Sequence, residues 1–538
     1  KSVCREIFLV VNKSAKPVSQ SRELLLDDED LAARMMRETL SKLKNRGEDK
    51  ASLARIYSFA FGDTDAEKKE VVVGQLEYTS AVALHKMHCA AVFGVEKAFD
   101  LTKEKVGDIT DGRRIQNPDR PVMLLRETPL HDWPTLPRRS GKTHAPQDIQ
   151  EAVNLLAQMT DAVLFPLFDR FRPFAVHNAE MRALRTRLQD PDMMAEPPQR
   201  KCFSLLFEGS GVRTVFESHL ERLKKRKKTA QDEGTEISDY TRNQLKDAQA
   251  IDGAWQQHRE KIKKYRAARL FYIDPERFFG NPDYQEDWPK LLNKANTIFD
   301  TVSTQAFQLG YLMAVHSVVE LMAYHETPYQ QRLAMVQFVA NLFVDALNAY
   351  FSSSSANEHR SYTGLVKESR ADVFNRNALG LRGLLVQSVQ ELNEKQWFFF
   401  RYAVLEMVHC KYAYPTVATT LEAASDPAIA QRYRDILPNL MGYLIDLRKQ
   451  YMEDAENTAI KSSGFQQELQ LLRAELQGAG KSHPEIIEQI NAKETAKTQE
   501  VQRQCQENLQ ASLGEMASAD KLMNRLLGDS GGEFGNNA

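Results

Sequence analysis

Cysteine is scarce in this sequence, with five occurrences in 538 residues. The five lie far apart, their number is odd, and no pair has the C-x-x-C spacing of a thiolate zinc site or a redox centre. They are Cys4, Cys89, Cys202, Cys410 and Cys505. A disulfide framework is therefore not predicted, and this cysteine usage is typical of a protein in a reducing, cytoplasmic compartment.

The sequence also lacks a strong net charge. It has 71 Lys and Arg against 73 Asp and Glu, which gives a formal net charge of -2. This balance disfavours bulk electrostatic capture of nucleic acid, but a local basic patch can still bind phosphates.

Long hydrophobic runs are missing as well. The most apolar stretch, 307–324, contains Gln308, His316 and Glu320, and these side chains are costly to place in hydrocarbon. No basic-then-apolar signal segment stands at the beginning of the sequence. We therefore expect 307–324 to be a buried helix of a soluble protein that has no membrane partner.

No complete set of catalytic or metal-binding residues is recognisable. The segment SGKT at 140–143 resembles the end of a phosphate-binding loop, but Leu136 stands where the required upstream glycine would be. His85 and His88 lie one helical turn apart beside Cys89, yet zinc needs two more ligands at a defined spacing. We therefore predict no metal site, interpret these three residues as core-packing residues, and assign no catalytic residue or cofactor.

Helical patterns account for most of the sequence. A short run of branched apolar residues at 6–11 predicts one buried strand, and Pro17 then fixes an extended turn. The acidic residues from Asp27 to Asp30 precede leucine and methionine at helical spacing, which predicts a capped helix over 29–43.

Prolines and glycines divide the following part of the sequence. A helix is predicted over 77–101, a long loop over 108–145, and a helical region over 148–189 that is interrupted near Pro166 and Pro173. A turn-rich break is predicted at 191–201, a polar helix ends at about 269, and long helices alternate from there to about 451.

The run FLVVNKSAKPVSQSRELLLDDEDLAARMMRETL at 8–40 resembles the proteins named for their DGQHR motif. Their relatives are the DndB-type regulators of DNA phosphorothioation, within the ParB–sulfiredoxin-like superfamily. Members carry a strand that ends in Asn, then a basic residue and a polar pair, and later a hydrophobic-Asp element. The matching residues here are Asn12, Lys13, Lys16, Pro17, Ser19, Leu26 and Asp27. The family's later elements are similar to GSGVRTVFESHLERL at 209–223, and the C-terminal half has no counterpart.

The naming Asp-Gly-Gln-His-Arg motif is absent, and in the family it precedes this strand. Together with Lys1 in place of Met, this absence predicts that the chain begins partway through the domain. The resemblance implies a cleft, formed by Asn12, Lys13, Lys16 and Asp27, that meets a nucleotide or a modified base. From the residues alone, Asn12 is equally a strand cap, Lys13 a solvated side chain and Asp27 a helix cap.

The expected fold is mainly α with a small α+β N-terminal portion, in which a truncated ParB-like domain precedes a large helical domain. The predicted order is a DGQHR-like domain over 1–228, a linker over 229–250, a helical domain over 251–460, a helical hairpin or coiled-coil-like segment over 461–527, and a disordered tail over 528–538.

Basic residues concentrate in two runs, at 222–228 and 259–269. On a helix, Arg259, Lys263 and Arg266 share one face. Two neighbouring helices of this kind would form a stripe that neutralises DNA phosphates in a salt-sensitive, sequence-independent way, and a pair of solvated helices is the alternative. The predicted DNA-contacting residues are Arg222, Lys224, Lys225, Arg226, Lys228, Arg259, Lys263 and Arg266.

The resemblance and the basic runs together predict a DNA-associated subunit or regulator of a bacterial DNA-modification or anti-phage defence system, with protein subunits as further partners. Two alternatives remain open. One is a nucleotide- or metal-dependent DNA-processing enzyme, a ParB-like NTPase or nuclease in which Asp27 or Asp28 binds a metal. The other is a helical scaffold over 251–527 that docks partner proteins.

Overall fold

The computed structural model describes residues 24–26, 30–45, 53–55, 76–93, 146–207, 210–270, 288–322, 327–351, 397–410, 413–461 and 463–503. The predicted strand at 6–11, the predicted loop at 108–145 and the predicted cleft residues Asn12, Lys13, Lys16 and Asp27 lie outside the described residues. Within the described part the fold is mainly α, which confirms this part of the prediction.

The elements follow one another in a long helical series with one short pair of strands. They are α3 (Leu31–Asn45), β1 (Ala54–Arg55), β2 (Thr79–Ser80), α5 (Ala81–Phe93), α8 (Pro146–Arg170), α9 (Arg172–Leu188), α10 (Pro191–Ala195), α11 (Pro197–Phe207), α12 (Ser210–Asp232), α13 (Asp239–Leu270), α15 (Trp288–Val302), α16 (Gln305–Leu321), α17 (Tyr329–Phe351), α20 (Trp397–Val408), α21 (Tyr414–Glu422), α22 (Pro427–Ile460) and α23 (Ser463–Gly478). A further helix spans 483–503.

The helix predicted over 29–43 is present as α3, and its acidic cap is Asp30. One Asp30 carboxylate oxygen accepts a hydrogen bond from the Ala32 backbone N–H at 2.8 Å, which is the normal role of an N-cap side chain. The helix predicted over 77–101 begins later, as α5 at Ala81. Residues 79 and 80 pair instead in parallel with β1, with Ala54 opposite Thr79.

Proline positions account for two errors in the predicted helix boundaries. Helix α8 continues through Pro166, and the break comes instead at Phe171, where Pro173 stands in the first turn of α9. The break predicted at 191–201 consists mostly of the short helices α10 and α11, each of which starts with a proline. Proline is well tolerated in the first turn because its missing N–H has no intrahelical partner there.

Helix α16 lies at the centre of the core, and the prediction of a buried helix over 307–324 is confirmed from Phe307 to Val319, while Glu320 and Leu321 at the end of the helix are half-buried. Every residue of α16 from Gln305 to Val319 is buried. The polar Gln308 is accommodated because its side-chain oxygen accepts a hydrogen bond from the Thr79 hydroxyl at 2.9 Å and its amide donates to the Tyr78 carbonyl oxygen. These bonds attach the short sheet to the helical core.

Gly310 permits the close approach of α16 and α20. A Cβ atom at position 310 would lie 2.5 Å from the Phe400 Cβ and 2.6 Å from the Trp397 carbonyl oxygen. We expect Gly310→Ala to destabilise the protein by about 1–3 kcal/mol, because backbone atoms of α20 must move to admit the methyl group. Urea unfolding measures this, with Gly253→Ala on α13 as the control, since a Cβ there meets nothing within 4 Å. Equal stability of the two variants would contradict the packing.

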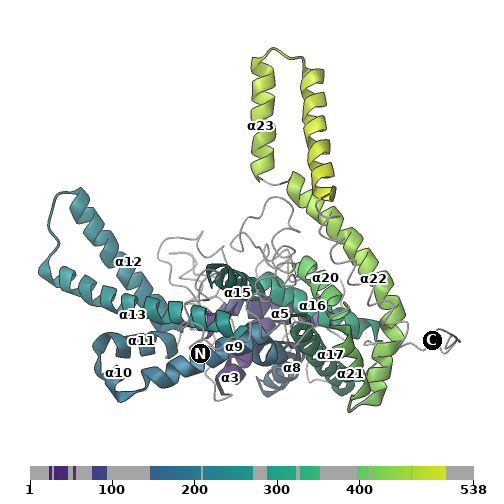
Figure 1. Cartoon of the computed structure of the whole chain (residues 1–538), viewed down its shortest axis with the longest axis horizontal. Helices are drawn as coiled ribbons and strands as arrows, with labels where there is room; N and C mark the ends of the chain where they lie inside the picture. The colour runs from purple at the N-terminus through teal and green to yellow at the C-terminus, as the bar shows by residue number, and fades with distance from the viewer. Residues whose placement is uncertain are drawn as a thin grey trace, which may run out of the picture.

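Two helical hairpins project from the body (Figure 1). Helices α12 and α13 form the first, which we call the arm, and α23 with the helix at 483–503 forms the second at the end of the long α22. Among the described residues, α17 is the one helix long and apolar enough to cross a membrane by length and composition. Of its most apolar window, 61% is buried inside the structure, which is also the pattern of a core helix.

Candidate nucleic-acid interface

The arm contains all eight predicted DNA-contacting residues. Its two antiparallel helices join through a turn at 233–238, and Gly234 ends α12 with a φ of 65°. The Thr235 backbone N–H donates to the Ala230 carbonyl oxygen at 2.8 Å, which together with the glycine is a Schellman cap. The predicted linker at 229–250 is thus mostly helix, because the polar residues that indicated solvation also suit the exposed faces of α12 and α13.

A narrow apolar seam holds the two helices of the arm together. Leu220 and Leu223 of α12 pack against Leu245 and Ala248 of α13, and Phe216 covers one end of this cluster. All the remaining faces of the outer part of α12 stay in solvent. Successive residues of a helix point about 100° apart, so a run of consecutive cations surrounds α12 except at the seam.

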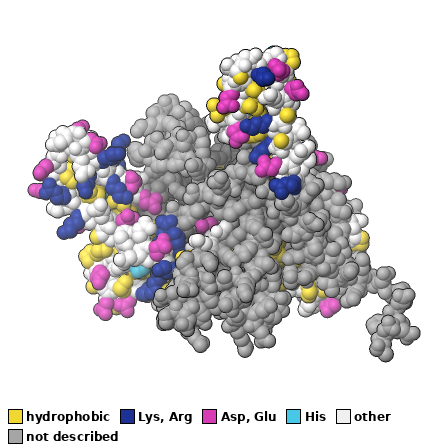
Figure 2. All heavy atoms as spheres, turned by 45° about the horizontal axis from the view of Figure 1, so that its top comes forward, with side chains coloured by type: hydrophobic (Ala, Val, Ile, Leu, Met, Phe, Trp, Pro, Cys, Tyr) yellow, Lys and Arg dark blue, Asp and Glu magenta, His cyan; other side chains and the backbone are white. Residues whose placement is uncertain are grey.

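Six cations at 222–228 are exposed, and most form no ion pair with the residues that the structure describes. They are Arg222, Lys224, Lys225, Arg226, Lys227 and Lys228, which we call the basic band. Lys224 pairs with Glu221 at 3.0 Å. Lys225, Arg226, Lys227 and Lys228 have no ion pair with any residue that the structure describes. The basic band is therefore available to an anionic partner (Figure 2).

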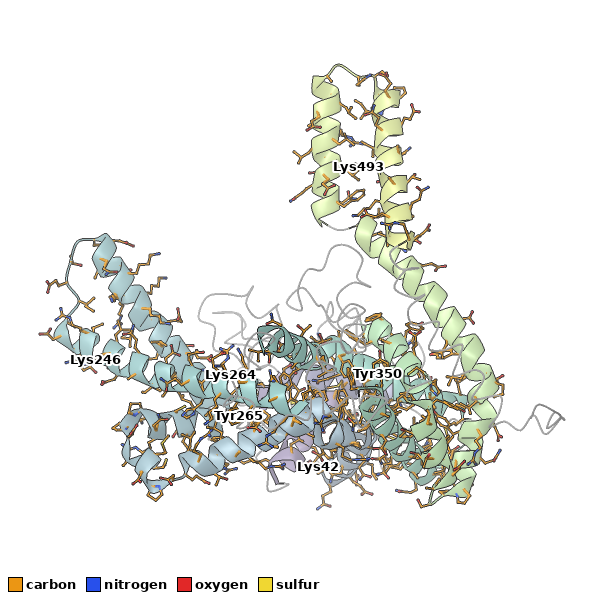
Figure 3. All side chains as sticks on the ribbon, in the orientation of Figure 1. Lys42, Lys246, Lys264, Tyr265, Tyr350 and Lys493 are labelled. Atoms are coloured by element: carbon orange, nitrogen blue, oxygen red, sulfur yellow. The ribbon has the colours of Figure 1, made fainter. Side chains whose placement is uncertain are left out.

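The end of the arm is acidic. Asp232, Glu233, Glu236 and Asp239 surround the turn, and Arg242 forms ion pairs with Asp239 at 2.8 Å and Glu236 at 3.6 Å. A polyanion is therefore repelled from the end and attracted to the side of the arm. Lys246 of α13 is exposed on the outer half of the arm and adds to the positive side (Figure 3).

The second basic run, at 259–269, is not a continuation of the basic band. Lys246 and Lys264 lie at opposite ends of α13 (Figure 3). At a rise of about 1.5 Å per residue they are about 27 Å apart along the axis. Lys263 is mostly covered and pairs with Glu260 at 3.1 Å, and Arg259 is half-buried.

Arg266 is fully buried, so its predicted role as a phosphate contact is corrected. Its guanidinium donates to the Asn296 side-chain oxygen at 2.9 Å and lies 3.6 Å from the centre of the Phe299 ring. It also contacts the His177 Nδ1 atom at 3.3 Å. On a helical wheel Arg266 lies beside Lys263, which suggested that both are exposed. The wheel does not show which side of α13 packs against the core.

His177 completes this buried arrangement as a neutral ring. Burial and the adjacent Arg266 lower the pKa of His177 to about 3, against a smaller opposing effect of its bond to the Leu76 backbone. Nε2 therefore carries the proton and donates to the Leu76 carbonyl oxygen at 2.8 Å, which leaves Nδ1 to accept from Arg266. The base of α13 is thereby linked to the segment that leads into β2.

The base of the arm has two more anchors to α9. The Arg172 guanidinium donates to the carbonyl oxygens of Leu270 and Arg269 at the C-terminus of α13. Arg269 in turn pairs with the buried carboxylate of Glu180. The arm is consequently fixed to the body through charged contacts on several sides, and its outer half extends into solvent (Figure 1).

A second polar cluster lies in the core between α3 and α5. His85 Nε2 forms an ion pair with Asp30 at 2.7 Å, and Cys89 Sγ lies 3.9 Å from the same ring. The side chains of His85, Cys89 and the neighbouring His88 are buried, which agrees with their interpretation as core residues. Among the residues that the structure describes, no group of three His, Cys, Asp or Glu is arranged to hold a metal ion.

The other half of this cluster joins α3 to α8. The Thr39 hydroxyl donates to Asp161 at 2.5 Å and accepts from His88 Nε2 at 2.9 Å, while Lys42 pairs with the second Asp161 oxygen at 2.9 Å. Burial, together with the nearby His85 and Lys42 charges, lowers the pKa of His88 to about 3. His88 is therefore neutral, and its one ring proton is on Nε2, which donates to Thr39.

No protein-family model, curated protein or solved structure matches the sequence. The resemblance to the DGQHR-motif proteins therefore stays a prediction. The basic band is the one group of predicted site residues that the described part of the chain brings together on an exposed surface. Sequence reasoning missed Lys246, because it stands alone in the sequence and joins the band only through the antiparallel pairing of α12 with α13.

Proposed function

We propose that the protein is a DNA-associated subunit or regulator that binds the phosphate backbone of duplex DNA through the side of its arm. The observation that carries this proposal is the basic band, in which six exposed cations occupy 222–228 on a helix that projects from the body. Lysine and arginine in such an arrangement neutralise phosphates without reading sequence.

The charge of the arm supports the proposal further. Residues 210–270 contain fifteen Lys and Arg against nine Asp and Glu, although the whole chain is slightly negative. The arm is therefore a local basic region in a protein that has no bulk affinity for polyanions. In line with the resemblance, we propose a bacterial DNA-modification or anti-phage defence system, in the cytoplasm, as its setting.

The test is binding of the protein to a labelled duplex across a salt series. A linear fall of log affinity with log salt is expected, and Lys225→Glu with Lys228→Glu should reduce the slope by about 2, since about 0.9 is lost per phosphate contact. The matched control is Arg473→Glu with Lys481→Glu, which makes the same change in net charge on exposed residues of the second hairpin. Equal slopes for the two variants would contradict binding at the arm.

The helical scaffold is the second candidate function. The observation in its favour is the second hairpin, which projects at the end of α22 and exposes Leu471 and Ile487. The same salt series separates the two functions. Absence of duplex binding at low salt, by the unaltered protein, would exclude the DNA proposal and leave protein docking as the better explanation of both hairpins.

A further inference from the structure

A groove of about 370 Å³ lies between α12 and α13 on the outer half of the arm. Three cations from both helices border it, namely Lys227, Arg242 and Lys246. Its volume falls within the range of about 300–1,000 Å³ that is usual for small-molecule sites. The groove is therefore larger than a single phosphate contact requires.

The walls of the groove differ in chemistry. Leu245 is buried beneath it and Ile237 is half-buried beside it, so that part of the lining is apolar. Gln231 and Gln249 contribute two exposed amides from opposite helices. An apolar surface beside side-chain amides suits a nucleobase, because the ring packs on the former while its polar edge bonds to the latter.

The charges at the groove favour an anion. Arg242 already forms ion pairs with the exposed Glu236 and Asp239, whereas Lys227 and Lys246 have no ion pair within the described residues. Glu236 is the one acid in the lining, and its side chain is 94% exposed, so water screens it. Two unpaired lysines consequently remain for a phosphate group.

We propose that this groove holds one unpaired nucleotide, with its phosphate on Lys227 and Lys246 and its base against Leu245 between the two glutamines. The inference rests on the proposed function, since it assigns to the same arm a place for a single nucleotide of a bound strand. An arm of this kind holds the backbone through the basic band and retains one base in the groove.

The experiment measures binding of the four deoxynucleoside monophosphates and of inorganic phosphate to the full chain by calorimetry. Lys227→Glu with Lys246→Glu should weaken nucleotide binding about tenfold or more. The matched control, Lys224→Glu with Lys225→Glu, makes the same charge change in the basic band outside the groove and should weaken it less than about threefold. Gln231→Ala with Gln249→Ala should weaken the binding of nucleotides about tenfold and leave the binding of inorganic phosphate unchanged.

Three outcomes would overturn the inference. The first is that the unaltered protein binds no nucleotide up to about 10 mM. The second is that phosphate and nucleotides bind with equal affinity. The third is that the groove variant and the control variant lose equal nucleotide affinity. Duplex binding in the salt series is scored separately. If the protein binds duplex DNA but no mononucleotide, the proposed function stands and the inferred nucleotide site is wrong. If a mononucleotide competes with a single-stranded oligonucleotide, the groove binds a nucleotide of a bound strand.

Discussion

Replacing Arg266 with glutamate should destabilise the protein by about 3–5 kcal/mol, because it places an uncompensated carboxylate in the core. The new charge would lie against the Phe299 ring, and it would leave Asn296 and His177 without their donor. Urea unfolding provides the measurement. The control is Arg226→Glu, the same substitution on an exposed residue of the basic band, which should change stability by no more than about 0.5 kcal/mol.

The same variant has a spectroscopic signature. Burial and Arg266 hold the pKa of His177 at about 3, below its unfolded value near 6.5, so the neutral ring stabilises the fold above pH 6.5. This contribution decreases as the pH falls from 6.5 towards 3. In any folded fraction of Arg266→Glu, the pKa of His177 should rise, as measured by NMR titration. An unchanged unfolding midpoint and an unchanged His177 titration would together contradict the buried arrangement.

Replacing Asp30 with asparagine should destabilise the protein by about 3–5 kcal/mol at pH 7, because His85 loses the carboxylate that stabilises its protonated form in the core. Asparagine is as good an N-cap as aspartate, so the bond to the Ala32 backbone N–H is retained and the ion pair is isolated. The control is Asp190→Asn at the exposed N-cap of α10, where about 0.5 kcal/mol or less is expected.

The Asp30–His85 pair also predicts a pH dependence. Burial lowers the pKa of His85, but the neighbouring Cys89 and Asp30 raise it more, to about 10. Burial raises the pKa of the Cys89 thiol, so Asp30 supplies the negative charge at neutral pH. Because the folded pKa of His85 exceeds its unfolded value near 6.5, the stabilisation is complete below pH 6.5 and is lost as the pH rises towards 10.

Unfolding free energies measured from pH 6.5 to 10 check this dependence. The unaltered protein should lose stability over that interval, and Asp30→Asn should show a smaller loss because its His85 is already neutral. Parallel curves for the two proteins would contradict a charged pair in the core.

Local patterns were sufficient for many elements of the fold. The start of α3 was predicted from an acidic cap ahead of leucine and methionine at helical spacing, and the burial of α16 was predicted from its apolar composition. The overall helical character was predicted from similar short-range patterns, and the structure agrees on all three points. Boundaries at prolines were predicted less well, since Pro166 lies inside α8 and prolines start α10 and α11. Whether a proline ends a helix or begins one depends on packing that the sequence pattern does not contain.

The candidate site was predictable in part. Five of the six cations at 222–228 are consecutive, so some of them must face solvent on any helix, and their exposure follows from the sequence itself. The run at 259–269 has similar composition but a different environment, with Arg266 in the core and Lys263 mostly covered. Composition alone does not distinguish these two runs.

The sequence by itself determined that the chain is mainly helical, that 307–319 is buried and that a dense group of cations occupies one helix, because these properties depend on residues close together in the chain. Only the tertiary structure decided that Arg266 joins His177 and Asn296, that Asp30 neutralises His85, and that Lys246 joins Lys227 at one groove. Each of these depends on which face of a helix meets a partner distant in sequence, and helical periodicity leaves that choice to packing.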